Sequence, residues 1–330
     1  MTKSKIALNI NLDTLGKFSG YAKLPYSVNR SAYGSLPIPV VSIRGGPGKT
    51  VLLLAGTHGD EFEGQVTLTK LAQELDAKDV SGQLIIVPMA NYPAAKAGHR
   101  VSPIDQGNLN RLYPGDPNGS SSEMIAHFIE TELMARADFV FDLHSGGASL
   151  NYLPATTSVM SAGSALAHER KAAMEALGAP YGLIFTSAPG AGSSSEAAAR
   201  RGIPRLGTEL GGRGWVHPVY SELCEVGVRR VLGRLGVIQA SELPLAQPVT
   251  FLSVDRECFV YATAAGVFEG SVTLGAEVKQ GDCAGKIYFP ETPLRLPEAV
   301  HFAADGIVVC ERAQAMCEIG DCLYHLGKPQ

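Results

Sequence analysis

The sequence lacks the features of a membrane or secreted protein. No apolar run approaches the roughly 20 residues of a membrane span, and residues 1–20 lack the apolar core of a signal peptide. An excess of one charge is also missing, because 28 Lys and Arg face 32 Asp and Glu, for a formal net charge of -4. This balance does not attract nucleic acid or an anionic membrane, so we expect a cytoplasmic protein without either partner.

Cysteine is absent from the first two-thirds of the chain, and the last third contains no Cys-x-x-Cys pair. These absences argue against a zinc knuckle or a dithiol redox site. The six cysteines are Cys224, Cys258, Cys283, Cys310, Cys317 and Cys322. We expect reduced thiols in the core rather than disulfides, because a cytosolic chain of this size does not need covalent cross-links.

Buried strands and helices are predicted to alternate over the first two-thirds of the chain. The length of 330 residues, 45% of them hydrophobic, is enough for a large core and about two domains. Short apolar runs predict strands over 50–55, 83–89, 137–143 and 181–185. Helical spacing covers 61–75, 122–135 and 164–177. The alternation predicts an α/β fold with a mostly parallel sheet flanked by helices on both faces.

The chain changes character after Pro244, where short β-type runs separated by glycine begin. We therefore place a domain boundary between residues 1–245 and 246–330. A hydrophobic-x-x-Gly-Asp turn at 278–282 returns at 317–321, which predicts a small β-barrel or β-sandwich with two related halves. Biotinyl and lipoyl carrier domains have similar turns, but their modified lysine is missing here. A structural cap is therefore the favoured interpretation.

Three side chains with metal-ligand chemistry follow two of the predicted strands. His58 and Glu61 come after 50–55, and His144 follows 137–143. The carboxyl ends of parallel strands meet at the edge of a sheet where ligands bind. Each residue alone could be an ordinary strand-end or helix-start residue, but two histidines and a carboxylate at one edge form a three-ligand zinc set. Such a set leaves a fourth position for water and is typical of catalysis.

Three nearby features have competing interpretations. Asp142 could orient a ligand imidazole, or it could be a strand-end hydrogen-bond acceptor. The segment 45–50 (GGPGKT) is no phosphate loop, because Ile43 stands where the first glycine belongs and a strand follows. Ser145 lacks the Gly-x-Ser-x-Gly turn of a serine nucleophile. Nucleotide binding and serine hydrolase chemistry are therefore not expected.

Four segments in chain order, GTHGDEFEG, NLNR, DLHSGG and TELGG, resemble the succinylglutamate desuccinylase and aspartoacylase family, relatives of the zinc carboxypeptidases. The resemblance spans most of residues 1–325. Residues 23–40 further resemble the branch that contains the Nα-acetyl-L-2,4-diaminobutyrate deacetylases of ectoine degradation. The resemblance implies a zinc-carboxypeptidase-like deacylase domain over 1–245, followed by an appended β-domain.

By this resemblance, one zinc ion per chain is bound by His58, Glu61 and His144, and Glu209 is the carboxylate that moves the proton. It takes a proton from the attacking water and returns it to the leaving amine. Glu209 is expected at the end of a strand over 204–210, in apolar surroundings that raise its pKa. The alternative is an ion pair between Glu209 and a nearby arginine, such as Arg205 or Arg213.

The resemblance also implies substrate-binding side chains. Arg111, with Asn110, matches the pair that binds a substrate carboxylate, and a guanidinium makes two parallel hydrogen bonds to such a group. Arg100 stands where the family has an arginine that stabilises the oxyanion. The surrounding HRVSPIDQGN departs from the aspartoacylase pattern, so a solvated loop position is the alternative for Arg100.

The implied activity is zinc-dependent hydrolysis of an N-acyl amino acid, with Nα-acetyl-L-2,4-diaminobutyrate as the leading substrate. Open alternatives are another acyl amino acid (acyl-aspartate or succinylglutamate), a metallocarboxypeptidase, and a metal-dependent binding module without turnover. Glu209 favours an enzyme, because a binder needs no proton shuttle. The substrate ammonium would need an acceptor, for which Asp105, Asp116 and Glu196 are candidates. The sequence does not identify the residues of the acyl pocket. It is compatible with a homo-oligomer.

Overall fold

Four parallel strands form the middle of the fold. The computed structural model describes residues 3–160, 166–186, 190–240 and 242–330. The strands lie side by side in the order β5 (Gln83–Val87), β4 (Thr50–Ala55), β6 (Phe139–Leu143) and β9 (Arg205–Gly212), and all pair in parallel. β5 and β6 are buried along their whole length, which explains their continuous apolar sequences. Their carboxyl ends meet at one edge, as predicted.

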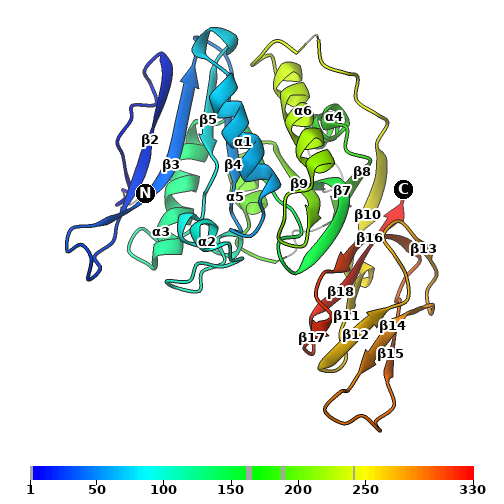
Figure 1. Ribbon diagram of the computed structural model, residues 1–330. Helices are drawn as coiled ribbons and strands as arrows, with labels where there is room; N and C mark the ends of the chain where they lie inside the picture. The colour runs from blue at the N-terminus through cyan, green and yellow to red at the C-terminus, as the bar shows by residue number, and fades with distance from the viewer. Residues whose placement is uncertain (1–2, 161–165, 187–189, 241) are drawn as a thin grey trace.

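Antiparallel strands extend this sheet on both sides, so the sheet as a whole is mixed rather than mostly parallel (Figure 1). On one side β1 (Ala7–Leu8) and the hairpin of β2 (Gly16–Pro25) and β3 (Ser35–Arg44) continue from β5. On the other side β7 (Leu150–Val159) runs antiparallel to β9 and parallel to β8 (Tyr181–Phe185). The prediction of a mostly parallel sheet was wrong, because hairpins and direct returns of the chain reverse the strand direction.

Helices cover both faces of the sheet, as predicted. One face carries α1 (Glu63–Glu74), α4 (Ala167–Leu177) and α6 (Pro218–Arg234), whose apolar residues share a core with β4 and β6. The opposite face carries α2 (Tyr92–Ala97), α3 (Ser121–Phe128) and α5 (Ser194–Arg200).

The helix boundaries differ from the sequence prediction. The helix predicted over 122–135 is broken, because α3 ends at Phe128 and is followed by a π-turn, Ile129–Leu133, and a 3₁₀ turn, Met134–Arg136. The helix predicted over 164–177 begins at Ala167, and residues 164 and 165 lie outside the described part of the chain.

The C-terminal strands form two sheets around a shared core. The large sheet continues through β10 (Thr250–Val254), β18 (Cys322–Pro329), β16 (Gly306–Arg312) and β13 (Glu277–Val278), with β11 (Phe259–Tyr261) also paired to β18. A second sheet has the order β15 (Glu298–His301), β14 (Cys283–Tyr288), β12 (Gly266–Gly270) and β17 (Met316–Cys317). Backbone pairing also links this part to the rest, through β10 with β8 and β16 with β7.

The two Gly-Asp segments adopt the same turn. The Lys279 N–H donates to Asp282 Oδ2 over 2.8 Å, and the Glu318 N–H donates to Asp321 Oδ2 over 2.9 Å. The glycine of each turn has a positive φ, of 92° and 87°. The sequence repeat therefore corresponds to a structural repeat, in which glycine supplies a left-handed backbone and aspartate closes the turn.

The cysteines are free thiols, in agreement with the prediction. Cys283 is the exception to the predicted burial, because it is exposed at the start of β14, whereas Cys322 is half-buried. The other four cysteines are buried. None of the helices that the structure describes is long and apolar enough to cross a membrane.

Candidate active site

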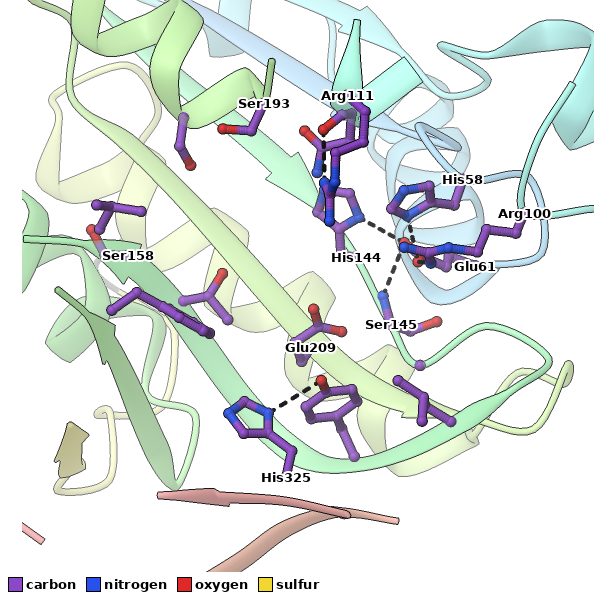
Figure 2. A pocket seen from close by; sticks show the side chains of 18 of the residues that line it. His58, Glu61, Arg100, Arg111, His144, Ser145, Ser158, Ser193, Glu209 and His325 are labelled. Carbon is purple, nitrogen blue, oxygen red and sulfur yellow. Dashed lines mark hydrogen bonds and ion pairs between the residues drawn. The ribbon is translucent and has the colours of Figure 1, made fainter. Parts of the chain in front are cut away.

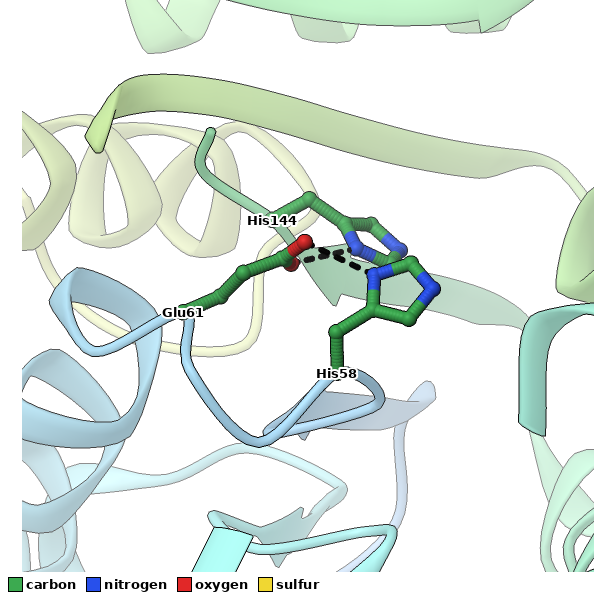
Figure 3. A group of neighbouring side chains, drawn as sticks. All are labelled: His58, Glu61 and His144. Atoms are coloured by element: carbon green, nitrogen blue, oxygen red, sulfur yellow. Dashed lines mark hydrogen bonds and ion pairs between the residues drawn. The ribbon is translucent and has the colours of Figure 1, made fainter. Parts of the chain in front are cut away.

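His58, Glu61 and His144 converge at the carboxyl edge of the sheet (Figure 3). His58 and Glu61 lie in the loop from β4 to α1, and His144 follows the adjacent strand β6. His58 Nδ1 lies 2.7 Å from Glu61 Oε1, and His144 Nδ1 lies 2.7 Å from Glu61 Oε2. All three side chains are buried. The structure thus brings together the three residues that the sequence singled out.

The outer nitrogen of each imidazole faces an oxygen. His58 Nε2 forms a 3.1 Å hydrogen bond with Asn108 Oδ1, whereas His144 Nε2 lies 3.0 Å from Asp142 Oδ2 as an ion-pair contact without hydrogen-bond geometry. Each ring can therefore carry its proton on Nε2 and present the lone pair of Nδ1 to the centre of the cluster. Metal-binding histidines commonly have this arrangement, in which an outer acceptor fixes the tautomer and the ring orientation. Two Nδ1 atoms and a carboxylate also match the donor set of zinc.

Asp142 is the centre of a buried hydrogen-bond network behind His144. Its Oδ1 accepts from Thr57 Oγ1 over 2.7 Å, and its Oδ2 accepts from Ser194 Oγ over 2.5 Å and from Arg205 over 3.2 Å. These contacts fix the carboxylate that faces the His144 ring. Of the two interpretations open for Asp142, the contacts favour the orientation of a ligand imidazole. Thr57, Ser194 and Arg205 were not predicted in this role, because they come from three separate segments.

The electrostatics of the cluster favour positive charge. Burial alone would raise the pKa of Glu61, but the two adjacent imidazoles hold it well below its ordinary value. Burial likewise disfavours protonation of His144, yet the carboxylates of Asp142 and Glu61 raise its pKa to about 10. The same negative field that stabilises a proton here would stabilise a metal cation. The residues therefore fit a divalent metal in both donor chemistry and charge.

A pocket opens beside the cluster and contains the other predicted site residues (Figure 2). Its volume is about 210 Å³. Glu209, Asn110, Arg111 and Arg100 all line it together with the three metal-ligand candidates. They come from β9, from the Leu109–Arg111 turn and from the loop after α2. The fold thus gathers segments separated by about 150 residues in sequence around one cavity.

Glu209 lies inside β9 rather than at its end, where it had been predicted, because the strand continues to Gly212. Its side chain is half-buried, and Oε2 has no hydrogen-bond partner in the described part of the chain. Burial, followed by the negative charge of Glu61, raises the pKa of Glu209 to about 8. The alternative of an ion pair with Arg205 or Arg213 is wrong, since these side chains bind Asp142 and Glu311.

Arg111 and Arg100 both direct positive charge into the pocket. Burial and the charge of Arg100 lower the pKa of Arg111, and no acidic residue within the described ranges forms an ion pair with it. Asn110 Oδ1 accepts from the Ser194 N–H over 2.9 Å, which ties this turn to the start of α5. Arg100 Nη1 lies 3.5 Å from Glu61 Oε1. The Arg100 side chain therefore reaches the site from a loop while remaining exposed to solvent, so both interpretations are partly met.

The wall opposite the metal ligands was not predicted. It contains Tyr152, Ser158, Phe185, Phe259 and His325, of which the last two belong to the C-terminal strands. Aromatic and histidine residues in a β-rich segment usually indicate a core, so the sequence had no separate signal for their place in the pocket.

The three acids considered as acceptors for a substrate ammonium do not line the pocket. Asp105 accepts from Ser122, and Asp116 closes a loop by accepting from the Asn118 N–H. Glu196 accepts from the Gly192 N–H. Each carboxylate is thus used in local structure, away from the pocket.

Comparison with known proteins gives one consistent result. Residues 47–235 match the succinylglutamate desuccinylase/aspartoacylase catalytic domain. The N-alpha-acetyl-L-2,4-diaminobutyric acid deacetylase of Halomonas elongata is 36% identical over 97% of this chain and 94% of its own length. The product-bound ectoine utilization protein EutE (DoeB) of Ruegeria pomeroyi has a TM-score of 0.95 at 37% identity, covering 99% of this chain and 100% of that one.

A second solved structure, described as a succinylglutamate desuccinylase from a Silicibacter strain, has a TM-score of 0.94 at 36% identity and covers both chains completely. The similarity therefore extends through the C-terminal strands, beyond the segment that the catalytic-domain match covers. The chain belongs to the succinylglutamate desuccinylase/aspartoacylase family.

Proposed function

We propose that this protein is a zinc-dependent amidohydrolase that removes the acyl group from an N-acyl amino acid. The observation that carries the proposal is the meeting of three metal-ligand side chains, His58, Glu61 and His144, with the carboxyl group of Glu209 in one pocket. A binding module would need the ligands only. A second, half-buried carboxyl group without a partner is the group that hydrolysis requires.

His58, Glu61 and His144 would hold one zinc ion, with Asn108 and Asp142 fixing the two imidazole rings. When bound, zinc acidifies water and polarises the carbonyl of the scissile amide. Glu209 accepts the proton of the attacking water on a carboxylate oxygen. It then donates that proton to the amide nitrogen, which leaves as the free amine. The raised pKa of Glu209 suits the second half of this transfer, the donation of the proton to the leaving amine.

Arg111 would bind the α-carboxylate of the substrate through its guanidinium, and Asn110 would support the same group. A planar guanidinium can donate two parallel hydrogen bonds, so Arg111→Lys should raise KM about tenfold despite the conserved charge. We assign Arg100 to the oxyanion that develops on the scissile carbonyl, because it lies beside Glu61 at the mouth of the pocket.

The proposed substrate is Nα-acetyl-L-2,4-diaminobutyrate, which would give acetate and L-2,4-diaminobutyrate in ectoine degradation. This choice is supported by the named activity of the Halomonas elongata relative and by the similarity to EutE. Among the described residues, the wall formed by Tyr152, Ser158, Phe185, Phe259 and His325 contains no Lys or Arg that could bind a second carboxylate. Acyl-aspartate and succinylglutamate are therefore the less favoured substrates.

The test is hydrolysis of acetyl-diaminobutyrate, acetyl-aspartate and succinyl-glutamate by zinc-loaded protein, with and without a chelator. We expect the highest kcat/KM for acetyl-diaminobutyrate and no turnover after zinc is removed. Glu209→Gln at equal zinc content is the control for adventitious hydrolysis. A preference for an acidic substrate would contradict the substrate assignment alone. Absence of turnover on all three would contradict the proposed enzyme function.

The domain assignment is also part of the proposal. Residues 1–245 would form a zinc-carboxypeptidase-like catalytic domain, and residues 246–330 a small β-domain of the sandwich type. The two identical Gly-Asp turns and the core shared by the two C-terminal sheets support this division. A cytoplasmic location and a small-molecule substrate are further parts of the same proposal, which is compatible with a homo-oligomer.

A further inference from the structure

A row of side chains crosses four neighbouring strands at the wall opposite the metal ligands. Cys310 of β16 lies opposite Tyr152 of β7 and also opposite His325 of β18. His325 in turn lies opposite Phe259 of β11. Residues paired in this way point to the same face of a sheet. We call Tyr152, Cys310, His325 and Phe259 the cross-strand row, and it consists mostly of C-terminal residues.

The imidazole of His325 is held rigidly at the centre of this row. It stacks on Phe259 with a centroid distance of 4.3 Å and an interplanar angle of 11°. The His325 and Tyr152 rings are nearly perpendicular, with 5.8 Å between their centroids. The centroid of the Phe185 ring lies 6.0 Å from that of His325. The small side chain of Cys310 leaves room for Tyr152 and His325 to meet across it. His325 is 1% exposed, so its orientation is set by packing.

One ring nitrogen of His325 has a partner and the other has none. Nδ1 lies 3.3 Å from Tyr152 Oη, as the dashed line in Figure 2 marks. Nε2 is buried and has no hydrogen-bond partner in the part of the chain that the structure describes. Buried polar atoms are rarely left unpaired, because the loss of hydration is not compensated. Since His325 lines the pocket, a bound ligand can supply the missing partner.

The surroundings select the chemistry of that partner. A tyrosine hydroxyl can donate or accept, so the 3.3 Å contact with Tyr152 Oη is compatible with either tautomer of His325. A ligand that can only donate, such as an ammonium, selects the tautomer in which Nδ1–H donates to Tyr152 and Nε2 presents a lone pair. Burial lowers the pKa of His325 to about 3, so the ring is neutral at neutral pH and does not repel a cation. Phe185 and Tyr152 also line the pocket, and aromatic rings attract cations.

We propose that His325 is a specificity-determining residue whose Nε2 accepts a hydrogen bond from the free side-chain ammonium of the substrate. The C-terminal strands would thereby select N-acyl diamino acids over acyl amino acids with an apolar side chain. This inference rests on the proposed deacylase function. It supplies the acceptor that Asp105, Asp116 and Glu196 do not provide.

The test compares two substrates that differ only in this ammonium, Nα-acetyl-L-2,4-diaminobutyrate and Nα-acetyl-L-2-aminobutyrate. For the zinc-loaded wild type we expect kcat/KM to favour the diamino substrate by at least about tenfold, the typical value of a hydrogen bond to a charged group. His325→Phe keeps the aromatic packing but removes the acceptor. It should bring the ratio close to one, mainly by raising KM for the diamino substrate, while acetyl-aminobutyrate kinetics change little.

Two further variants separate recognition from a structural role. His325→Gln retains an acceptor and should keep part of the preference, and His301→Phe, at an exposed position of β15, should keep all of it. His325→Leu replaces His325→Phe if the latter does not fold, as judged by thermal melting. An unchanged ratio in a folded variant without the acceptor, or an equal loss on both substrates, would overturn the proposal. If the wild type cleaves neither substrate, the proposed function itself fails.

Discussion

The two walls of the pocket are built in opposite ways. The metal-ligand wall consists of charged side chains held by short hydrogen bonds, and it comes from loops that directly follow the parallel strands β4 and β6. The cross-strand row consists of neutral side chains held by ring packing, and most of it comes from strands more than 100 residues later. Under the two proposals above, the chemistry depends on the first wall and the choice of substrate on the second.

Removal of a metal ligand should have the largest effect on zinc content and activity. We expect His58→Ala, Glu61→Ala or His144→Ala each to lose most of the zinc and essentially all activity, because two ligands are too few to hold the ion. Elemental analysis of purified protein measures this, with His301→Ala as the matched control. Full zinc content in all three variants would refute the ligand assignment.

Glu209→Gln should separate catalysis from metal binding within the same wall. The amide keeps the shape of the side chain but cannot accept the proton, so we expect kcat to fall by roughly two orders of magnitude or more. Zinc content and thermal stability should remain near those of the wild type. Turnover close to normal would mean that another group acts as the base.

Asp142→Asn tests whether the network behind His144 supports the metal. The loss of the carboxylate that orients the ring should weaken zinc binding by roughly 10- to 100-fold, as measured by competition with a chelator. Asp138→Asn is the matched control, because Asp138 lies just before the same strand and accepts from the Thr50 N–H at the surface. Equal zinc affinities for the two variants would show that the network has no such role.

A substitution in the cross-strand row should have the smallest effect. It should change how the free energy of unfolding depends on pH. The pKa of His325 is about 3 in the folded chain and about 6.5 when unfolded, so only the unfolded state binds this proton between those values. Stability therefore falls as pH decreases below 6.5. From pH 7 to pH 5 this group should reduce the free energy of unfolding by about 2 kcal/mol.

Urea unfolding of wild type and His325→Phe at the two pH values measures this contribution. The variant lacks the titrating group, so its loss of stability between pH 7 and pH 5 should be smaller by the same amount. His58, which also titrates, is present in both proteins and cancels in the comparison. Equal pH dependence in the two proteins would mean that His325 is not held neutral by burial.

The two walls also differ in how far the sequence could predict them. His58, Glu61 and His144 could be found because each follows a strand whose apolar run is continuous, and parallel strands bring their ends together. Asn108 and Asp142 lie close in sequence to predicted site residues. Their contacts with the His58 and His144 rings nevertheless depend on how the loops fold. Arg205 was considered only as a partner for Glu209, because nothing local relates it to Asp142.

The cross-strand row could not be predicted, since its members meet only through strand pairing. β7 was missed as a strand because Pro154 interrupts its pattern, and the structure has a register shift between Tyr152 and Ala155 at that point. The antiparallel return on this side of the sheet was missed for the same reason, and on the other side the hairpin of β2 and β3 was not predicted either. His325 has the sequence surroundings of an ordinary core residue, so its place in the pocket follows only from the register of β16 and β18.

The register of β16 and β18 limits which mutations the cross-strand row can tolerate. Side chains alternate between the two faces of a strand, so inserting or deleting one residue in β18 ahead of His325 would turn the imidazole away and bring a neighbour such as Leu326 to its position. Substitutions within the row carry no such penalty, because the backbone pairing stays the same. New substrate preferences in this lineage should therefore arise by exchange of side chains, with changes in length confined to the turns between the strands.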